Sequence, residues 1–191
     1  MIRTRVGYAG GTGRHPTYHN LDGHAETVQI DFDPSRISYA DLLDIFWHTH
    51  NPETRPWSWQ YSSIIFYHDA DQQRLAEETK FHHEETHRKV KLYTEIIHYN
   101  DFFLAEDYHQ KYWLQQNVNV LNEFSAIYPD FAGIVNSTSA ARVNGILGGY
   151  GTFDGTAEEL SSYGLSPQTN KFLIDTIRQW GGGNKLERVI A

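Results

Sequence analysis

Residues 15–34, HPTYHNLDGHAETVQIDFDP, gather side chains that can donate and accept protons. Tyr18, His24 and Glu26 lie around a glycine turn that leads into a strand, and Tyr61 follows later in the chain. A Glu whose pKa is raised by burial can act as a general acid, and phenols can donate hydrogen bonds to a developing oxyanion. Such a group could polarise an X=O bond. Spacing alone favours the alternative, a surface Glu beside two tyrosines that pack through their rings.

A second candidate site is His83-Glu84-Glu85-Thr86-His87, which matches the H-E-x-x-H pattern of a zinc-binding helix. Glu106 follows at a separation that could supply a third ligand. Against this reading, the helix offers few apolar residues to bury, and histidines gather readily at the negative end of a helix dipole. A short pattern also arises easily in a chain with 11 histidines. A zinc hydrolase therefore stays open as an alternative.

Composition limits the chemistry further. The 191 residues contain no cysteine, which excludes disulfides, thiolate metal sites and a thiol nucleophile among them. A formal net charge of -8 argues against nucleic acid and anionic membrane as partners, because both require a basic face. No apolar run approaches the roughly 20 residues that span a bilayer, and the N-terminal residues lack the apolar centre of a signal peptide. The default expectation is a cytoplasmic protein.

The hydrophobic pattern predicts an α+β fold, with helices packed on a mixed sheet. Val28, Ile30 and Phe32 alternate in a half-buried strand that Asp33-Pro34 ends, and Ser38 with Asp41 forms a capping box for the next helix. The further predicted elements are an interior strand at 61–67, a polar helix from 69 to about 88 that buries Leu75, Ala76 and Phe81, a strand at 90–97, and a helix from Ala105.

From about residue 118, glycines break the chain into short helical pieces. Ser166-Pro167 is a typical helix start, and Gly181 to Gly183 is a typical stop. The predicted domains are therefore a main domain at 1–117 and a small helical extension at 118–191, which contains no pattern that indicates catalysis.

Several sequence motifs, read in order, resemble the A-type peptide methionine sulfoxide reductases over residues 5 to about 116. They are Val6-Gly7-Tyr8-Ala9-Gly10-Gly11, Pro16-Thr17-Tyr18, Gly23-His24-Ala25-Glu26, Phe46-Trp47 with His50, Gln60-Tyr61, and Ala105-Glu106-Asp107-Tyr108-His109-Gln110. Two later motifs, Ala140 to Gly145 and Gly164 to Ser166, are similar to the long C-terminal extension of a divergent animal branch.

The resemblance implies a ferredoxin-like sheet and a known chemistry. In this family a cysteine thiolate attacks the sulfur of methionine S-sulfoxide in proteins, while a Glu and two Tyr hold and protonate the departing oxygen. By resemblance these are the catalytic Glu26, Tyr18 and Tyr61, with His24 and Asn51 as substrate-binding residues. The thiol becomes a sulfenic acid, which a second thiol clears, and the family's reductant is thioredoxin-like. No cofactor or metal is implied.

This sequence departs from the family in three respects. The family's nucleophile lies in a Gly-Cys-Phe-Trp-Gly motif ahead of the Val-Gly-Tyr-Ala-Gly-Gly motif, and this chain carries neither that motif nor the resolving cysteines. Asn51 also stands where many members have Asp, and Ser62 where many have Arg. The family's first strand and helix are part of the missing segment, so we expect an unpaired gap between two strands and an uncovered apolar surface.

Two further expectations follow for this chain. As given, it should not reduce methionine sulfoxide, because the nucleophile is absent. If no nucleophile-bearing segment accompanies it, the alternative is a pseudoenzyme, a binding module for methionine-containing peptides.

Overall fold

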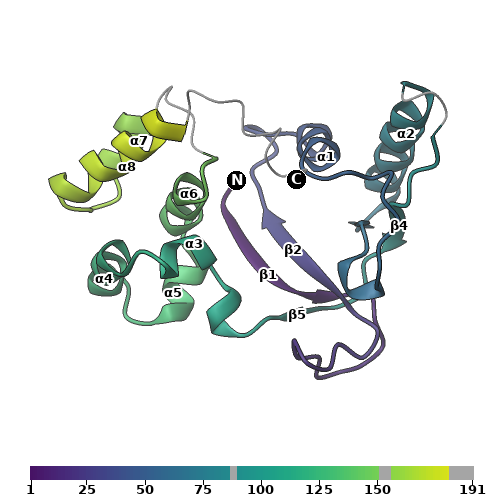
Figure 1. Ribbon diagram of the computed structural model, residues 1–191, viewed down its shortest axis with the longest axis horizontal. Coiled ribbons are helices and arrows are strands. Elements are labelled where there is room, and N and C mark those ends of the chain that lie inside the picture. The colour runs from purple at the N-terminus through teal and green to yellow at the C-terminus, as the bar shows by residue number, and fades with distance from the viewer. Residues whose placement is uncertain (87–89, 151–155, 181–191) are drawn as a thin grey trace.

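The computed structural model describes residues 1–86, 90–150 and 156–180. Its central sheet has three antiparallel strands, β1 (Arg3–Ala9), β2 (Ala25–Asp31) and β5 (Phe102–Leu104), in the order β2-β1-β5 (Figure 1). β1 is the middle strand, and its residue Tyr8 pairs with Glu26 on one side and Phe103 on the other. This register brings the start of β2 and the end of β1 to the same end of the sheet, where Ala9 pairs with Ala25.

A second, parallel sheet contains β3 (Ile64–Tyr67) and β4 (Glu95–His98). The helices α1 (Tyr39–His48) and α2 (Ala70–Thr86) pack with it around a small core of Leu43, Trp47, Ile65, Ala76 and Leu92. The predicted capping box is confirmed, since the Ser38 side chain accepts from the Asp41 backbone and the Asp41 carboxylate accepts from Ser38. The α+β class is confirmed, with the strands in two small sheets.

Four sequence predictions differ from the structure. β3 is shorter than 61–67 and is an edge strand instead of an interior one, because within the described residues it pairs only with β4. The strand at 90–97 begins only at Glu95, while Leu92 before it packs into the core. Phe81 is 65% exposed, because it lies on the solvent side of a helix that buries Ala76. The helix from Ala105 is instead the 3-10 helix η2 (Asp107–His109).

The remaining helices form what we call the helical unit, residues 112–150 and 156–180. They are α3 (Tyr112–Gln115), α4 (Val118–Ile127), α5 (Phe131–Asn136), α6 (Thr138–Leu147), α7 (Thr156–Ser161) and α8 (Pro167–Trp180). Their core includes Phe124, Ile134, Val143, Leu160 and Leu173, each at most 2% exposed. The helix start at Pro167 is confirmed, and the predicted stop at Gly181 to Gly183 lies outside the described residues. The boundary at 117 stays a prediction, although Leu114 of α3 already belongs to this core.

Side chains from the helical unit and its approach take the place of a strand along part of β1. β5 pairs only with Gly7 to Ala9, so the earlier half of that β1 edge needs other partners. The Thr138 hydroxyl donates to the Ile2 carbonyl, the Lys111 ammonium to the Thr4 carbonyl, and the Gln110 amide to the Val6 carbonyl. Every second carbonyl of the edge is thereby satisfied, which joins the helical unit to the sheet.

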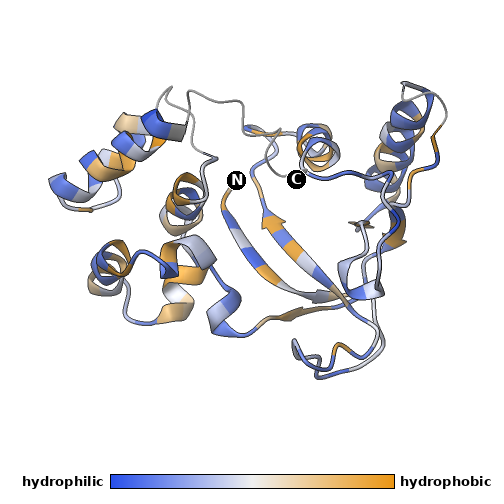
Figure 2. Ribbon diagram, viewed as in Figure 1, coloured by the Kyte–Doolittle hydropathy of each residue, from blue (hydrophilic) through white to orange (hydrophobic). Residues whose placement is uncertain are grey.

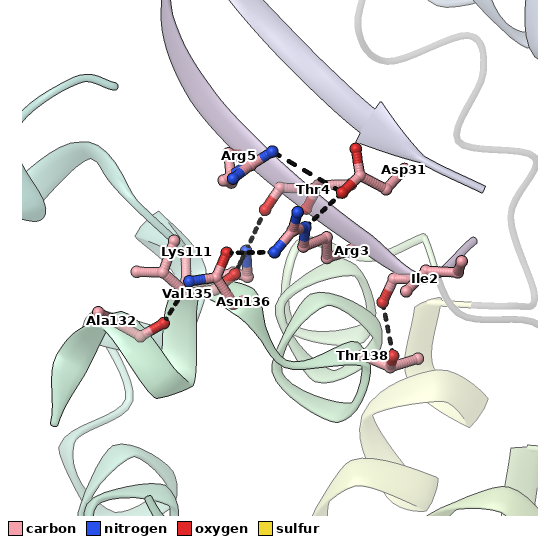
Figure 3. A network of polar contacts seen from close by, with 10 residues as sticks. All are labelled: Ile2, Arg3, Thr4, Arg5, Asp31, Lys111, Ala132, Val135, Asn136 and Thr138. Carbon is pink, nitrogen blue, oxygen red and sulfur yellow. Dashed lines mark hydrogen bonds and ion pairs between the residues drawn. The ribbon is translucent and has the colours of Figure 1, made fainter. Parts of the chain in front are cut away.

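Figure 3 shows the middle of this junction. Lys111 has a left-handed backbone and is 5% exposed, and its Nζ also donates to the Val135 carbonyl of α5. Arg3 pairs with Asp31 of β2 and donates to the Asn136 side chain. The junction is therefore polar, with side chains bonded to main-chain oxygens on both sides.

An apolar groove separates the two sheets. β2 and β3 are both edge strands, and a cavity of about 450 Å³ lies between them, lined by Val28 and Ile30 of β2, Ile64 and Phe66 of β3, and Leu42 of α1. The alternating apolar residues of β2 are visible in Figure 2. Val28 is 57% exposed, because no described element covers it. The structure therefore has the unpaired gap and the open apolar surface that the sequence predicted.

Among the described residues, no helix is long and apolar enough to cross a membrane.

Candidate active site

A partly buried hydrogen-bond network holds the loop that carries Tyr18. The Tyr8 hydroxyl of β1 donates to Glu106 Oε2 at 2.6 Å, and the Tyr18 backbone N–H donates to Glu106 Oε1 at 3.1 Å. Both carboxylate oxygens of Glu106 are therefore engaged by one strand and one loop. The pKa of Tyr8 is raised, first by burial and then by the bond to Glu106, and that same bond lowers the pKa of Glu106. The network fixes Tyr18 relative to the sheet.

His24 supports the same loop from inside. It is 1% exposed, its Nδ1 accepts from the Gly11 N–H at 3.1 Å, and its Nε2 lies 2.9 Å from the Gly13 carbonyl, to which it donates. Gly11 must be a glycine here, since a Cβ at that position would lie 2.4 Å from the backbone nitrogen of His24. Both ring nitrogens serve the loop, which favours the supporting role. Its predicted contact with substrate stays a prediction.

Glu26, at the start of β2, meets the 3-10 helix η1 (Trp59–Tyr61). The Gln60 side-chain amide donates to Glu26 Oε1 at 2.6 Å and to the Tyr61 hydroxyl at 3.2 Å. One amide therefore links the carboxylate of β2 to the phenol that precedes β3. This link crosses the groove between the two sheets at its end.

Tyr18 and Tyr61 also meet. A hydrogen bond with the Tyr18 hydroxyl raises the pKa of Tyr61, and the nearby Glu26 charge acts in the same direction. The Tyr61 phenol can donate a hydrogen bond to an acceptor. The structure thus brings together Tyr18, Glu26 and Tyr61, which come from a loop, a strand and a 3-10 helix.

A cavity of about 300 Å³ adjoins this cluster, lined by Tyr18, Glu26, Val6, Ala105 and His109 among others. The His109 ring lies 4.9 Å from the Tyr18 ring, and its buried Nε2 has no hydrogen-bond partner within the described residues. Glu26 lies where this cavity and the groove meet, and its side chain is exposed. The described residues therefore leave the Glu26 side chain open to water.

Asn51 lies apart from the cluster. Its side-chain oxygen accepts from the Glu53 N–H at 3.0 Å, in a turn that lines a third cavity together with Trp47, His48 and His83. That cavity shares no lining residue with the one that adjoins Tyr18. The predicted substrate-binding role of Asn51 stays a prediction without support from this geometry.

The residues of the zinc pattern are only partly described, since His87 lies outside the described residues. The His83 ring packs against Trp47, with ring centroids 5.0 Å apart, while the proposed third ligand Glu106 is bound by Tyr8 and Tyr18. Over 1–86, 90–150 and 156–180 there is no group of three His, Cys, Asp or Glu residues that could hold a metal ion. The described geometry gives the zinc reading no support.

Three residues of the cluster were not assigned to this site from the sequence: Tyr8, Gln60, and Glu106, which was considered only as a zinc ligand. Each belongs to a motif that carried the family resemblance, but nothing in the motifs indicates which side chains meet. Gln60 was the one with a usable signal, because it directly precedes Tyr61.

Comparison with known proteins agrees with these observations. Residues 1–136 match the peptide methionine sulfoxide reductase family. A peptide methionine sulfoxide reductase from Drosophila melanogaster is 36% identical over 180 residues, which cover 94% of this chain and 72% of that protein. The alignment thus reaches into the helical unit. The enzyme MsrA from Methanothermobacter thermautotrophicus is 42% identical over 127 residues, 61% of this chain and 75% of that protein.

Solved structures give the same result. Methionine sulfoxide reductase A of Corynebacterium diphtheriae superposes with a TM-score of 0.54 at 27% identity, covering 61% of this chain and 64% of that one. Reduced Mxr1 from Saccharomyces cerevisiae also has a TM-score of 0.54, at 26% identity, and covers 60% of this chain and 71% of that one. With the family match and the placement of Tyr18, Glu26 and Tyr61 together, the chain belongs to the peptide methionine sulfoxide reductase family.

Proposed function

We propose that this chain forms the oxygen-binding half of a methionine sulfoxide reductase site and binds methionine S-sulfoxide residues of proteins. The observation that carries the proposal is the meeting of Tyr18, Glu26 and Tyr61. Gln60 links Glu26 to Tyr61 at the end of the groove, and Tyr18 lines the adjoining cavity with Glu26. Two phenol donors and a carboxyl group suit a sulfoxide oxygen, which accepts hydrogen bonds and becomes a leaving group only when protonated.

In the proposed reaction, Tyr18 and Tyr61 hold the oxygen by hydrogen bonds while Glu26 donates a proton to it. A thiol attacks the sulfoxide sulfur and forms an S–S bond, and the S–O bond breaks as the oxygen takes up the protons of Glu26 and the thiol and leaves as water. Water then attacks the sulfur of the former thiol, which breaks the S–S bond, releases the thioether and a sulfenic acid, and returns a proton to Glu26. A second thiol converts that sulfenic acid to a disulfide and water. Because the 191 residues contain no cysteine, both thiols must come from outside them, the second by family resemblance from a thioredoxin-like reductant.

Glu26 requires an additional condition to act as this acid. Its side chain is exposed at the mouth of the groove, where water competes for its hydrogen bonds. A segment that fills the groove would exclude that water. We propose that the same segment brings the nucleophile, so that the acid and the thiol are completed together.

Binding can be tested without turnover. We expect the chain to bind a peptide with methionine S-sulfoxide more tightly than the same peptide with methionine, measured by NMR titration. Tyr18→Phe and Tyr61→Phe should each reduce that preference severalfold, because each removes one donor to the oxygen. Glu53→Gln, which alters an exposed carboxylate in the neighbouring turn, should leave it unchanged.

Equal affinity for the two peptides in the unaltered chain would contradict the proposal. With dithiothreitol as the reductant, the chain alone should give no methionine product, and measurable product would contradict the proposal that a segment filling the groove must bring the nucleophile. The pseudoenzyme reading is favoured if binding is found but no thiol-bearing segment ever produces turnover.

A further inference from the structure

The loop that leads into η1 holds a tryptophan in an unusual position. Trp57 is 82% exposed, the largest exposed fraction among the large hydrophobic residues of the described chain. A tryptophan side chain is normally buried over most of its surface, and a large exposed one near a cavity is typical of a binding surface. Packing within the rest of the described chain before the helical unit, residues 1–86 and 90–111, which we call the sheet region, does not explain the exposed position of Trp57.

Trp57 is directly connected to the proposed oxygen site. Its ring lies on the Tyr61 ring, with centroids 4.8 Å apart and planes 33° apart. Tyr61 itself is 41% exposed and shares Gln60 with Glu26. The two rings form a continuous apolar surface, which we call the Trp57 shelf, and its inner end is the phenol that would hold the oxygen.

The shelf lies in a loop that is bonded at its start to Tyr93 and that ends in the 3-10 helix η1, which is bonded to Glu26. At the start, the Tyr93 N–H donates to the Pro52 carbonyl at 2.9 Å and the Thr54 N–H to the Asn51 carbonyl at 3.2 Å. After it, the Ser62 N–H donates to the Trp59 carbonyl at 3.0 Å. An anchored loop presents a ring with little loss of conformational entropy on binding, which favours a contact surface over a chance protrusion.

We propose that the Trp57 shelf binds the peptide segment next to the oxidised methionine and gives the site a preference for an apolar flanking residue. This inference rests on the proposed function, because the shelf starts where the sulfoxide oxygen would be held. A methionine side chain is short, so when its oxygen reaches the phenols its backbone and neighbouring side chains lie close to the surrounding surface. The Trp57 ring is a large exposed apolar group in contact with Tyr61, and aromatic residues of this kind often contribute much of the binding energy of an interface.

The test compares three ligands by isothermal titration calorimetry. They are N-acetyl-methionine S-sulfoxide amide, which has no flanking residues, a peptide with leucines on both sides of the methionine sulfoxide, and the same peptide with serines. We expect the unaltered chain to bind the leucine peptide about tenfold more tightly than the serine peptide, the ratio that corresponds to 1.4 kcal/mol.

Trp57→Ala should bring this ratio close to one and leave affinity for the unflanked ligand unchanged. Trp57→Phe should keep part of the ratio, because a smaller ring still covers Tyr61. The matched control is Phe81→Ala, since Phe81 is also a largely exposed aromatic residue but lies on α2. This control should keep the full ratio.

Three results would overturn the shelf. They are a leucine preference that survives in Trp57→Ala, no leucine preference in the unaltered chain, and equal weakening of the unflanked ligand, which would mean that Trp57 acts only by positioning Tyr61. Failure of the proposed function is distinguishable, because it concerns sulfoxide against methionine at constant flanking residues. If the chain prefers leucine to serine as flanking residue but binds the sulfoxide and methionine peptides equally, the shelf is supported and the proposed oxygen site is contradicted.

Discussion

The helical unit and the sheet region bury their apolar residues to very different extents. In the helical unit, residues from every long helix meet in one core, with Phe124, Val143 and Leu173 fully buried. In the sheet region, the corresponding cluster around Trp47 and Leu43 is small, and the apolar side chains of β2 line an open groove instead. An amphipathic face contributes to stability only when another element covers it. The helices of the helical unit cover each other's apolar faces, whereas the apolar residues of β2 and β3 that line the groove are not covered by another described element.

The largest expected effect comes from filling the groove. A synthetic peptide with an alternating apolar strand followed by Gly-Cys-Phe-Trp-Gly should pair with the free edges of β2 and β3 and place a thiol beside Glu26 and Tyr61. Reduction of a methionine S-sulfoxide peptide with dithiothreitol should then rise from undetectable to measurable, followed by chromatography of the product. The same peptide with serine in place of cysteine should bind without turnover. If the cysteine peptide binds and no product forms, a segment bound in the groove does not complete the site.

A matched pair of valine substitutions measures the difference between the two regions directly. Val143→Ala removes fully buried methyl groups and should lower the free energy of unfolding by about 2–3 kcal/mol. Val28→Ala removes the same groups from a residue that is 57% exposed and should cost less than about 0.5 kcal/mol. Urea unfolding followed by circular dichroism gives both values. Equal losses would show that Val28 is covered in solution.

The junction between the two regions should make stability depend on pH at alkaline values. Burial, with a smaller effect from Arg5, lowers the pKa of Lys111 from 10.5 to about 8. Between these values the unfolded chain binds more protons than the folded one, so the free energy of unfolding rises with pH. We expect the difference between the unaltered chain and Lys111→Met to increase by about 2 kcal/mol from pH 8 to pH 10.5. Lys91→Met changes an exposed lysine and should show no such trend. A difference between the unaltered chain and Lys111→Met that decreases with pH would contradict the burial argument.

Inside the site, a smaller effect than at the junction is expected. Tyr8→Phe removes the donor to Glu106 and should cost about 1 kcal/mol at neutral pH. The bond to Tyr8 lowers the pKa of Glu106, so its contribution is present above the ordinary value of 4.5 and is lost as the pH falls through the lowered value. The difference between the two proteins, measured by urea unfolding, should therefore shrink only in acid. A difference that stays constant down to pH 2 would assign the effect to packing alone.

Local sequence signals were reliable where a few neighbouring residues decide the structure. The capping box of Ser38 and Asp41 and the proline start of α8 both follow from hydrogen bonds and dihedral angles within one turn. The prediction that β3 is an interior strand was wrong. A continuous apolar run indicates that both faces of a strand should be covered, but it does not show whether the strand has a neighbour on each edge. Whether the covering elements are present is a property of the whole chain.

The candidate site divides in the same way. The motifs marked Tyr18, Glu26 and Tyr61 individually, but spacing alone favoured a surface Glu with packed tyrosines. Their meeting depends on long-range pairings, namely β1 with β2, Glu106 with Tyr8 and Tyr18, and Gln60 with Glu26. Motif spacing contains no information on these contacts, which is why Glu106 was first considered as a metal ligand.

The sequence by itself determined the α+β class, the family and the absence of a thiol among these 191 residues, because composition, periodicity and ordered motifs are properties of the chain. Only the tertiary structure decided that Tyr61 and Glu26 line one groove while Tyr18 and Glu26 line the adjoining cavity, and that Gln110, Lys111 and Thr138 complete the edge of β1. It also decided that Trp57 extends the site outward. The physical reason is that each of these features requires residues far apart in the sequence to satisfy each other's hydrogen bonds or cover each other's surface, and only folding brings them together.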